Sequence, residues 1–168
     1  MAEISATAVK ELRDRSGAGV MECRRALEES GGDIDKAIIV LQEAGATKAA
    51  KRSGRETGQG VVESYIHGGR IGVLVEVNCE SDFVARTEDF KGLAHDLAMQ
   101  IAATNPKFVD PSELPAGSED DPKEVCLLAQ PFIKEPARTM AEVVKDVINK
   151  TGENVRVRRF ARFELGAD

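Results

Sequence analysis

The residues best suited to catalysis in this chain are two histidines and a few carboxylates, and they form no recognisable catalytic pattern. His67 follows a β-rich run, and His95 falls inside a helical pattern but away from its apolar stripe. The sequence contains no P-loop, GxSxG or HExxH motif. We therefore expect no catalytic residue, and neither a metal site nor a cofactor.

One acidic segment offers two weak alternatives to that expectation. Cys79 stands beside Glu80 and could be a reactive thiol, although reactivity requires a positive environment that lowers the pKa. A small buried cysteine at the end of a strand is the commoner arrangement. Glu76, Glu80 and Asp82 could together bind a divalent cation, but solvated surface carboxylates are the simpler interpretation.

Two apolar residues, Met21 and Phe83, occupy sequence positions where a functional role is worth considering. Helical positions advance by about 100° per residue, so Met21 points away from the stripe of Val20, Cys23 and Leu27. Because methionine adapts to varied contacts, an off-stripe Met21 is a candidate for a partner surface. Phe83 lies in the stretch SDFVA, between a predicted strand and a predicted helix, where loops often carry function. Composition alone favours Phe83 as a core residue.

The first 45 residues predict three short helices in a small bundle. Ser5 and Asp33 are expected to cap the first and third helices, and Gly17 and Gly45 to end them. A basic segment at 46–57 follows, and we interpret it as a linker. Its positive charges could contact phosphates, but a solvated connector is favoured. These charges are Lys48, Lys51, Arg52 and Arg55.

Residues 58–168 change to a mixed pattern. Two runs rich in Val and Ile, separated by His67 and two glycines, predict a β-hairpin. Thr87 is the expected cap of a long helix, and Thr139 with Glu142 forms a capping box for another, which Gly152 is expected to end. The alternating tail from Val155 predicts a third strand. The fold class is therefore α+β, with a small antiparallel sheet and helices on one side.

Composition narrows the classes of partner. The net charge is −6, which disfavours a free-standing nucleic-acid binder, and no stretch of 18 apolar residues predicts a membrane span. The N-terminus lacks the pattern of a signal peptide. Three widely spaced cysteines without CxxC predict reduced thiols in a cytoplasmic protein.

Two long motifs resemble the elongation factor Ts family. Residues 12–27 read LRDRSGAGVMECRRAL, where that family has LRxxTGAGxMxCKxAL. Residues 76–86 read EVNCESDFVAR, where the family has EVNCxTDFVAR. The tail GENVRVRRFARFELG is similar to the family's closing strand. The resemblance covers nearly the whole chain, and both departures at the threonine keep a hydroxyl.

The resemblance implies a UBA-like bundle followed by an α+β core, and a role in releasing GDP from the GTPase elongation factor Tu. It assigns one set of residues to disturbing the partner's magnesium and a second set to docking on the partner's G domain. The first set is Ser81, Asp82, Phe83 and Val84; the second is Lys10, Arg13, Val20 and Met21.

The chain departs from the family pattern in two ways. Family members carry a helical hairpin between the core helix and the QPF stretch. In this chain a short segment joins these two elements, and we expect the hairpin to be missing. Many members also have two copies of the core motif, whereas this chain has one. We therefore expect a homodimer. Phe160 should lie on the sheet face opposite Val155, Val157, Ala161 and Phe163, where a second copy would bury it.

Three rival functions remain possible from the residues alone. A generic helical interaction module would explain residues 1–45 but leaves SDFVA without a role. A ribosome- or RNA-associated protein would use the basic segment and would show a steep salt dependence of affinity. A thiol enzyme centred on Cys79 would require a depressed thiol pKa.

Overall fold

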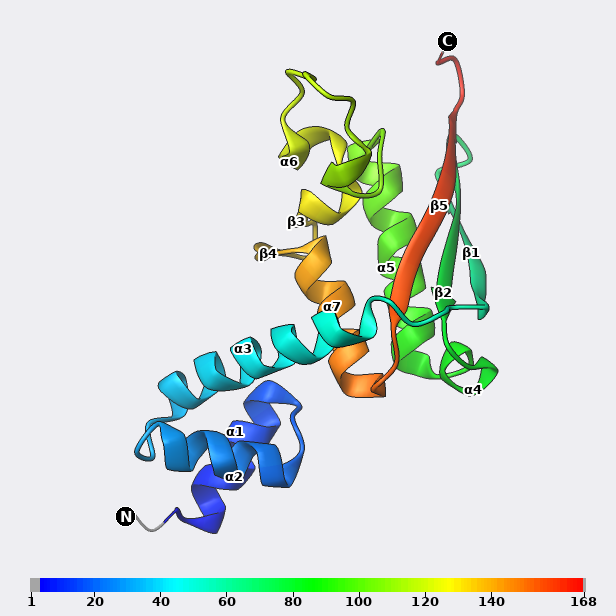
Figure 1. The fold of residues 1–168 in the computed structure, drawn as a ribbon. Coiled ribbons are helices and arrows are strands. Elements are labelled where there is room, and N and C mark those ends of the chain that lie inside the picture. Colours follow the sequence, from blue (N-terminus) through cyan, green and yellow to red (C-terminus); the bar gives the residue numbers. More distant parts are fainter. Residues whose placement is uncertain (1–3, 168) are drawn as a thin grey trace. The chain divides into compact units, whose positions relative to one another are not determined.

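The computed structural model describes residues 4–167 and divides the chain into two compact units. The first unit ends at Arg52 and the second begins at Ser53. Figure 1 traces the elements of both units.

The first unit is a bundle of three helices. They are α1 (Ala6–Ser16), α2 (Val20–Glu29) and α3 (Ile34–Arg52). The expected caps are confirmed: the Ser5 hydroxyl accepts the Ala8 amide, and the Asp33 carboxylate accepts the Lys36 amide at 3.1 Å. Gly17 ends α1 with φ +68°, a conformation that favours glycine. The buried core is small and consists of Leu12, Cys23, Ala26, Leu27 and Ala37.

The third helix is longer than the sequence predicts. Gly45 does not end it, because its backbone stays helical and the helix continues to Arg52. A glycine inside a helix costs about 1 kcal/mol relative to alanine, but the residues that follow are mostly good helix formers. The first part of the segment expected to be a linker is therefore helical.

The second unit is built on a three-stranded antiparallel sheet with the order β1-β2-β5. The strands are β1 (Gln59–His67), β2 (Ile71–Cys79) and β5 (Val155–Glu164). The predicted hairpin between β1 and β2 is confirmed, and Gly68 and Gly69 turn it with positive φ. At Gly60, a Cβ would come within 2.1 Å of the Val77 carbonyl oxygen, so the two strands approach too closely there for any side chain.

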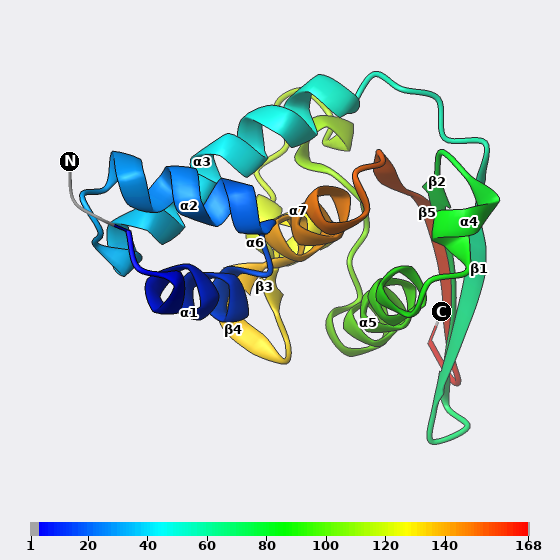
Figure 2. The ribbon, with the colours of Figure 1, turned by 90° about the horizontal axis from the view of Figure 1, so that it is seen from below.

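Helices cover one face of this sheet, as the sequence predicts. The long helix α5 (Glu88–Thr104) packs along β1 and β2, and α7 (Met140–Thr151) packs against α5 and β5. Figure 2 shows both helices on the same side of the sheet. The Thr87 cap, the Thr139–Glu142 capping box and the end of α7 at Gly152 are confirmed. The largest fully buried side chains here include Phe90, Leu97, Ile101, Leu127 and Met140.

The stretch between α5 and α7 contains more structure than expected. It forms the short turns η1 (Pro111–Glu113), α6 (Pro122–Val125) and η2 (Leu127–Ala129), and a small hairpin of β3 (Pro131–Phe132) and β4 (Glu135–Thr139). Buried Gln100 on α5 holds the hairpin, because it donates to the Pro131 carbonyl and accepts the Ile133 amide.

The expected orientation of Phe160 is wrong. The pairing of β2 with β5 shifts between Glu76 and Val77, which oppose Arg159 and Val157, so Arg158 is an extra residue in β5. A bulge of this kind reverses the alternation of faces beyond it. Phe160 and Arg162 therefore lie on the helix-covered side, where Arg162 donates to the Ala102 carbonyl of α5. Phe163 lies on the open face and is 72% exposed.

Candidate functional site

The SDFVA stretch forms a single helical turn at the end of β2. This turn is α4 (Asp82–Ala85), and Ser81 caps it by accepting the Val84 amide at 3.3 Å. Thr87 closes the far end by donating its hydroxyl to the Val84 carbonyl at 2.8 Å. We call residues 81–85 the Phe83 turn.

The Phe83 turn has one buried side and one exposed side. Val84 and Ala85 are buried against the core, whereas the Phe83 side chain is 77% exposed. The interpretation of Phe83 as a core residue is therefore wrong. Asp82 is also exposed and pairs with Arg86 one turn later, at 2.7 Å. Of the four residues that the resemblance assigns to the partner's magnesium site, Asp82 and Phe83 can be reached from outside in this structure. Val84 anchors the turn.

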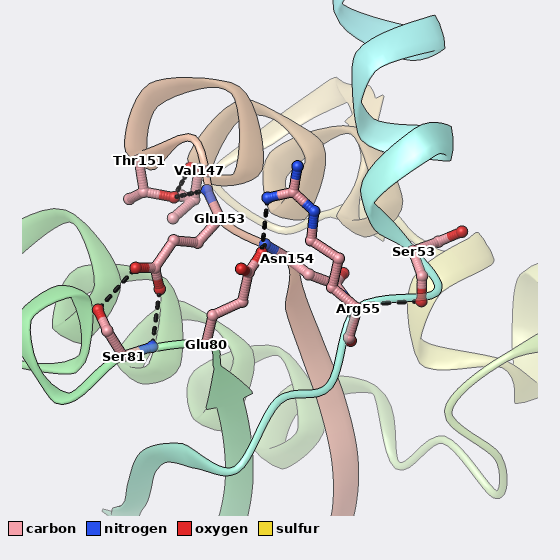
Figure 3. A network of polar contacts seen from close by, with 8 residues as sticks. All are labelled: Ser53, Arg55, Glu80, Ser81, Val147, Thr151, Glu153 and Asn154. Atoms are coloured by element: carbon pink, nitrogen blue, oxygen red, sulfur yellow. Dashed lines mark hydrogen bonds and ion pairs between the residues drawn. The ribbon is translucent and has the colours of Figure 1, made fainter.

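Polar contacts from the far end of the chain hold the Phe83 turn (Figure 3). The Glu153 carboxylate, just after α7, accepts both the Ser81 amide at 3.0 Å and the Ser81 hydroxyl at 2.6 Å. The preceding Glu80 accepts the Asn154 amide at 2.6 Å and pairs with Arg55 at 3.3 Å. We call the contacts of Glu80 and Ser81 with Glu153 and Asn154 the clamp. Glu153 and Asn154 were not predicted from the sequence, because nothing in their local pattern indicates a partner more than 70 residues away.

Cys79 does not have the environment of a reactive thiol. Its side chain is buried, and its thiol lies 3.1 Å from the Ser81 carbonyl. Burial, followed by the nearby Glu153 charge, raises the pKa of the Cys79 thiol to about 11. Since thiol enzymes require a lowered pKa, this observation argues against the thiol-enzyme alternative.

The three carboxylates considered as a cation site have other partners. Glu76 pairs with Arg158 and Arg159, and its hydrogen bond from Arg159 is the main cause that holds its pKa below the ordinary value. Glu80 is part of the clamp, and Asp82 pairs with Arg86. Within residues 4–167, no group of three or more potential ligands is placed to hold a metal ion.

All four predicted docking residues of the bundle are exposed. Lys10 and Arg13 lie on α1, and Val20 and Met21 begin α2 with 51% and 72% of their side chains exposed. Val20 is thus more exposed than its place on the predicted apolar stripe suggests. We call these four residues the bundle surface. Ile39 on α3, 54% exposed, is a further apolar residue that the sequence analysis passed over as one of a run of aliphatic positions.

The open face of the sheet presents a second exposed apolar surface. Every second pair of facing residues across the strands points away from the helices, and Ile66 lies over Gly72, whose added Cβ would meet it at 3.2 Å. We call this surface the open sheet face. Its large exposed side chains are Val62, Ile66, Leu74 and Phe163.

Comparison with known proteins identifies the family. The elongation factor Ts family model matches residues 32–121, more than half of the chain. The elongation factor Ts of Desulforamulus reducens is 52% identical over 197 aligned positions, covering 99% of this chain and 91% of that protein. That of Carboxydothermus hydrogenoformans is 49% identical, covering 97% and 89%.

A third relative is a longer protein than this chain. The elongation factor Ts of Thermosynechococcus vestitus is 50% identical and covers 99% of this chain but 67% of that longer protein. The alignment with the Desulforamulus protein is longer than the 168 residues of this chain, so that relative carries residues which this chain lacks. No helix among the described residues is long and apolar enough to cross a membrane. Together with both motifs, these matches show that the chain belongs to the elongation factor Ts family.

Proposed function

We propose that this chain is a guanine nucleotide exchange factor that promotes GDP release from elongation factor Tu during translation elongation. The observation that carries the proposal is Phe83, a large apolar side chain that is 77% exposed on a turn anchored on both sides. Such exposure is unfavourable in the free protein, and a partner that covers the ring would remove this cost. The proposed role requires no catalytic residue, and it places the chain in the cytoplasm, where ribosomes work.

Exchange follows from linkage. A factor that binds the empty GTPase more tightly than the loaded GTPase must weaken nucleotide binding by the same ratio. Burying Phe83 between elements of the partner would contribute about 1.5–3 kcal/mol. Because this corresponds to one or two decades of affinity, Phe83 alone does not account for exchange, and the bundle must add docking energy.

Asp82 is suited to act on the partner's magnesium. Within residues 4–167 its carboxylate pairs with Arg86, both side chains are exposed, and such pairs contribute about 0–1 kcal/mol. A magnesium shell or its water ligands would therefore compete easily for the Asp82 oxygens. Ser81 and Val84 act in this proposal as supports, because the first is bound to Glu153 and the second is buried.

Docking on the G domain falls to the bundle surface. Met21 and Val20 on α2 supply exposed apolar area, and Lys10 and Arg13 on α1 supply exposed positive charge. Aromatic residues, methionine and arginine are enriched in protein interfaces, which supports this assignment. We also propose that the bundle is UBA-like, which is supported by the sequence resemblance and by its three packed helices.

The experiment that tests the proposal is release of fluorescent GDP from purified elongation factor Tu, with an excess of unlabelled GDP. We expect release to accelerate with the concentration of the chain and to reach a plateau. A release rate that equals the spontaneous rate at micromolar concentrations of the chain would reject the proposed function. Boiled chain serves as the control for salt and carry-over.

We also propose that the working form is a homodimer joined through the open sheet face. The surface is apolar at its centre, with Leu74 51% exposed on the middle strand. It is bordered at one end by Glu76 with Arg158 and Arg159, charges of both signs that a two-fold axis would bring near their counterparts. The second copy, rather than another protein, is therefore its proposed occupant.

Sedimentation equilibrium at micromolar concentration tests the dimer. We expect a mass of twice 18.1 kDa for the wild type and 18.1 kDa for Leu74→Glu. Ile133→Glu, which places the same charge on an exposed residue of the small hairpin, is the matched control and should remain dimeric. A wild type that sediments at 18.1 kDa across the range would contradict the dimer.

A further inference from the structure

The Phe83 turn cannot hold its shape by itself. A single turn of four helical residues has few internal hydrogen bonds and an unfavourable nucleation step. Val84 and Ala85 fasten it to the core, but burial is not directional and leaves the rotation of the turn open. Thr87 holds the C-terminal end of the turn through the Val84 carbonyl, and the hydrogen bonds of Ser81 set the direction of its N-terminal end.

Glu153 supplies these hydrogen bonds. Its two carboxylate oxygens accept the amide and the hydroxyl of the same residue, Ser81, at 3.0 Å and 2.6 Å. Hydrogen bonds to an ionised carboxylate are stronger than those between neutral groups, and two of them fix a direction. A serine hydroxyl has one proton. Since Glu153 takes that proton, a hydroxyl lone pair is left facing the Val84 amide that Ser81 caps.

The residues next to Ser81 and Glu153 form a second hydrogen bond, in which the segment after β2 accepts instead of donating. Glu80 accepts the Asn154 amide at 2.6 Å, so two consecutive residues after β2 bind two consecutive residues before β5 (Figure 3). Asn154 is itself buried, and its side-chain amide donates to the Ser53 and Arg55 carbonyls at 3.3 Å and 2.9 Å. Glu153 is therefore held on a rigid base.

We propose that Glu153 is a positioning residue for nucleotide exchange: it touches no partner atom but fixes the direction in which Asp82 and Phe83 are presented. This inference rests on the proposed exchange function. It assigns to a residue at the end of α7 a part in the work of a loop more than 70 positions earlier in the chain.

The test compares Glu153→Gln with wild type in the fluorescent GDP release assay. Glutamine keeps the shape of the side chain, but its NH₂ group cannot accept, so one of the two Ser81 donors loses its partner. We expect the plateau release rate to fall about tenfold, and the concentration for half-maximal release to change less than about twofold, because docking by the bundle is untouched. Glu119→Gln, the same charge change in an exposed loop, should match wild type.

A double mutant separates positioning from general destabilisation. If Glu153 acts through the Phe83 turn, Glu153→Gln added to Phe83→Ala should slow release by less than about twofold further. If the two substitutions reduce the release rate by factors that multiply in the double mutant, the inference is overturned. A plateau rate of Glu153→Gln equal to that of wild type would also overturn it. If the wild-type chain does not accelerate GDP release from elongation factor Tu, the proposed exchange function fails, and the positioning role in exchange fails with it.

Amide hydrogen exchange tests the clamp without any partner. In Glu153→Gln we expect the Ser81 and Val84 amides to exchange about tenfold faster, while the buried amides of α5 keep their wild-type rates. Unchanged protection at Ser81 and Val84 would overturn the inference even where the release assay succeeds.

Discussion

The Phe83 turn and the bundle surface both expose apolar side chains, but the chain orients them by different means. Met21 and Val20 are oriented by α2, a regular helix whose faces follow from the local sequence. Phe83 is oriented by a one-turn helix capped by Ser81, and Ser81 is held by Glu153, which lies more than 70 residues later in the same unit. A surface on a regular helix should tolerate distant substitutions, whereas a surface on a clamped turn should be sensitive to them.

The largest expected effect comes from removing the ring on the clamped turn. Phe83→Ala should slow the plateau rate of GDP release at least about tenfold, because truncating a central aromatic residue of an interface often costs 2 kcal/mol or more. The thermal midpoint should stay close to that of wild type, since the ring is mostly exposed. Leu165→Ala, at a comparably exposed apolar residue, is the control. Wild-type exchange by folded Phe83→Ala would remove Phe83 from the mechanism.

A substitution on the bundle surface should change binding instead of the plateau. Met21→Asp should raise the concentration for half-maximal release about tenfold by burying a charge at the interface. Its helical circular dichroism should equal that of wild type, because Met21 is 72% exposed. Ala44→Asp, at an exposed position of α3, controls for the added charge. Loss of helical signal in Met21→Asp would instead make Met21 a structural residue.

The two phenylalanines of β5 should differ in how much each contributes to stability. Phe160 faces the helices after the bulge, so Phe160→Ala should lower the free energy of unfolding by about 2–3 kcal/mol. Phe163→Ala, on the open sheet face, should lower it by less than about 1 kcal/mol in the monomeric Leu74→Glu background. Urea unfolding measures both. The reverse order would restore the alternation that the sequence predicts.

The smallest expected effect concerns Cys79 beneath the Phe83 turn. Its pKa rises from 9.0 in the unfolded reference to about 11 in the folded protein, so its contribution to stability is fully present below pH 9. That contribution is lost as the pH rises through about 11, because the unfolded state releases its thiol proton first. Stability should therefore decline less steeply between pH 9 and 11 in Cys79→Ala than in wild type. Parallel curves from urea unfolding would contradict the shift.

The parts of the molecule that the sequence predicted correctly are governed by local rules. Ser5, Thr87, Thr139 and Gly152 bound their helices because caps depend on residues within three or four positions. The hairpin at Gly68 follows from turn chemistry alone. The class of the fold followed from these elements in order.

The parts that it missed depend on distant contacts or on a single inserted residue. The continuation of α3 through Gly45 is a case in which good helix formers outweigh one poor residue. Arg158 reverses the faces of the last strand, and no residue type signals a bulge there. Glu153 looks like an ordinary residue after a helix, and its contact with Ser81 becomes visible only when β2 and β5 lie side by side.

The bulge at Arg158 also acts as a register lock. A regular strand can slide by two residues against its neighbour and still keep its apolar side chains on the same face. In β5 such a slide would carry the extra residue away from its place beside Glu76 and Val77; if the bulge stayed in that place, either Phe160 or Val157 would turn to the open face. The strand thus has a single low-energy alignment. The distance along the sheet between the clamp at one end and Phe163 at the other is therefore fixed.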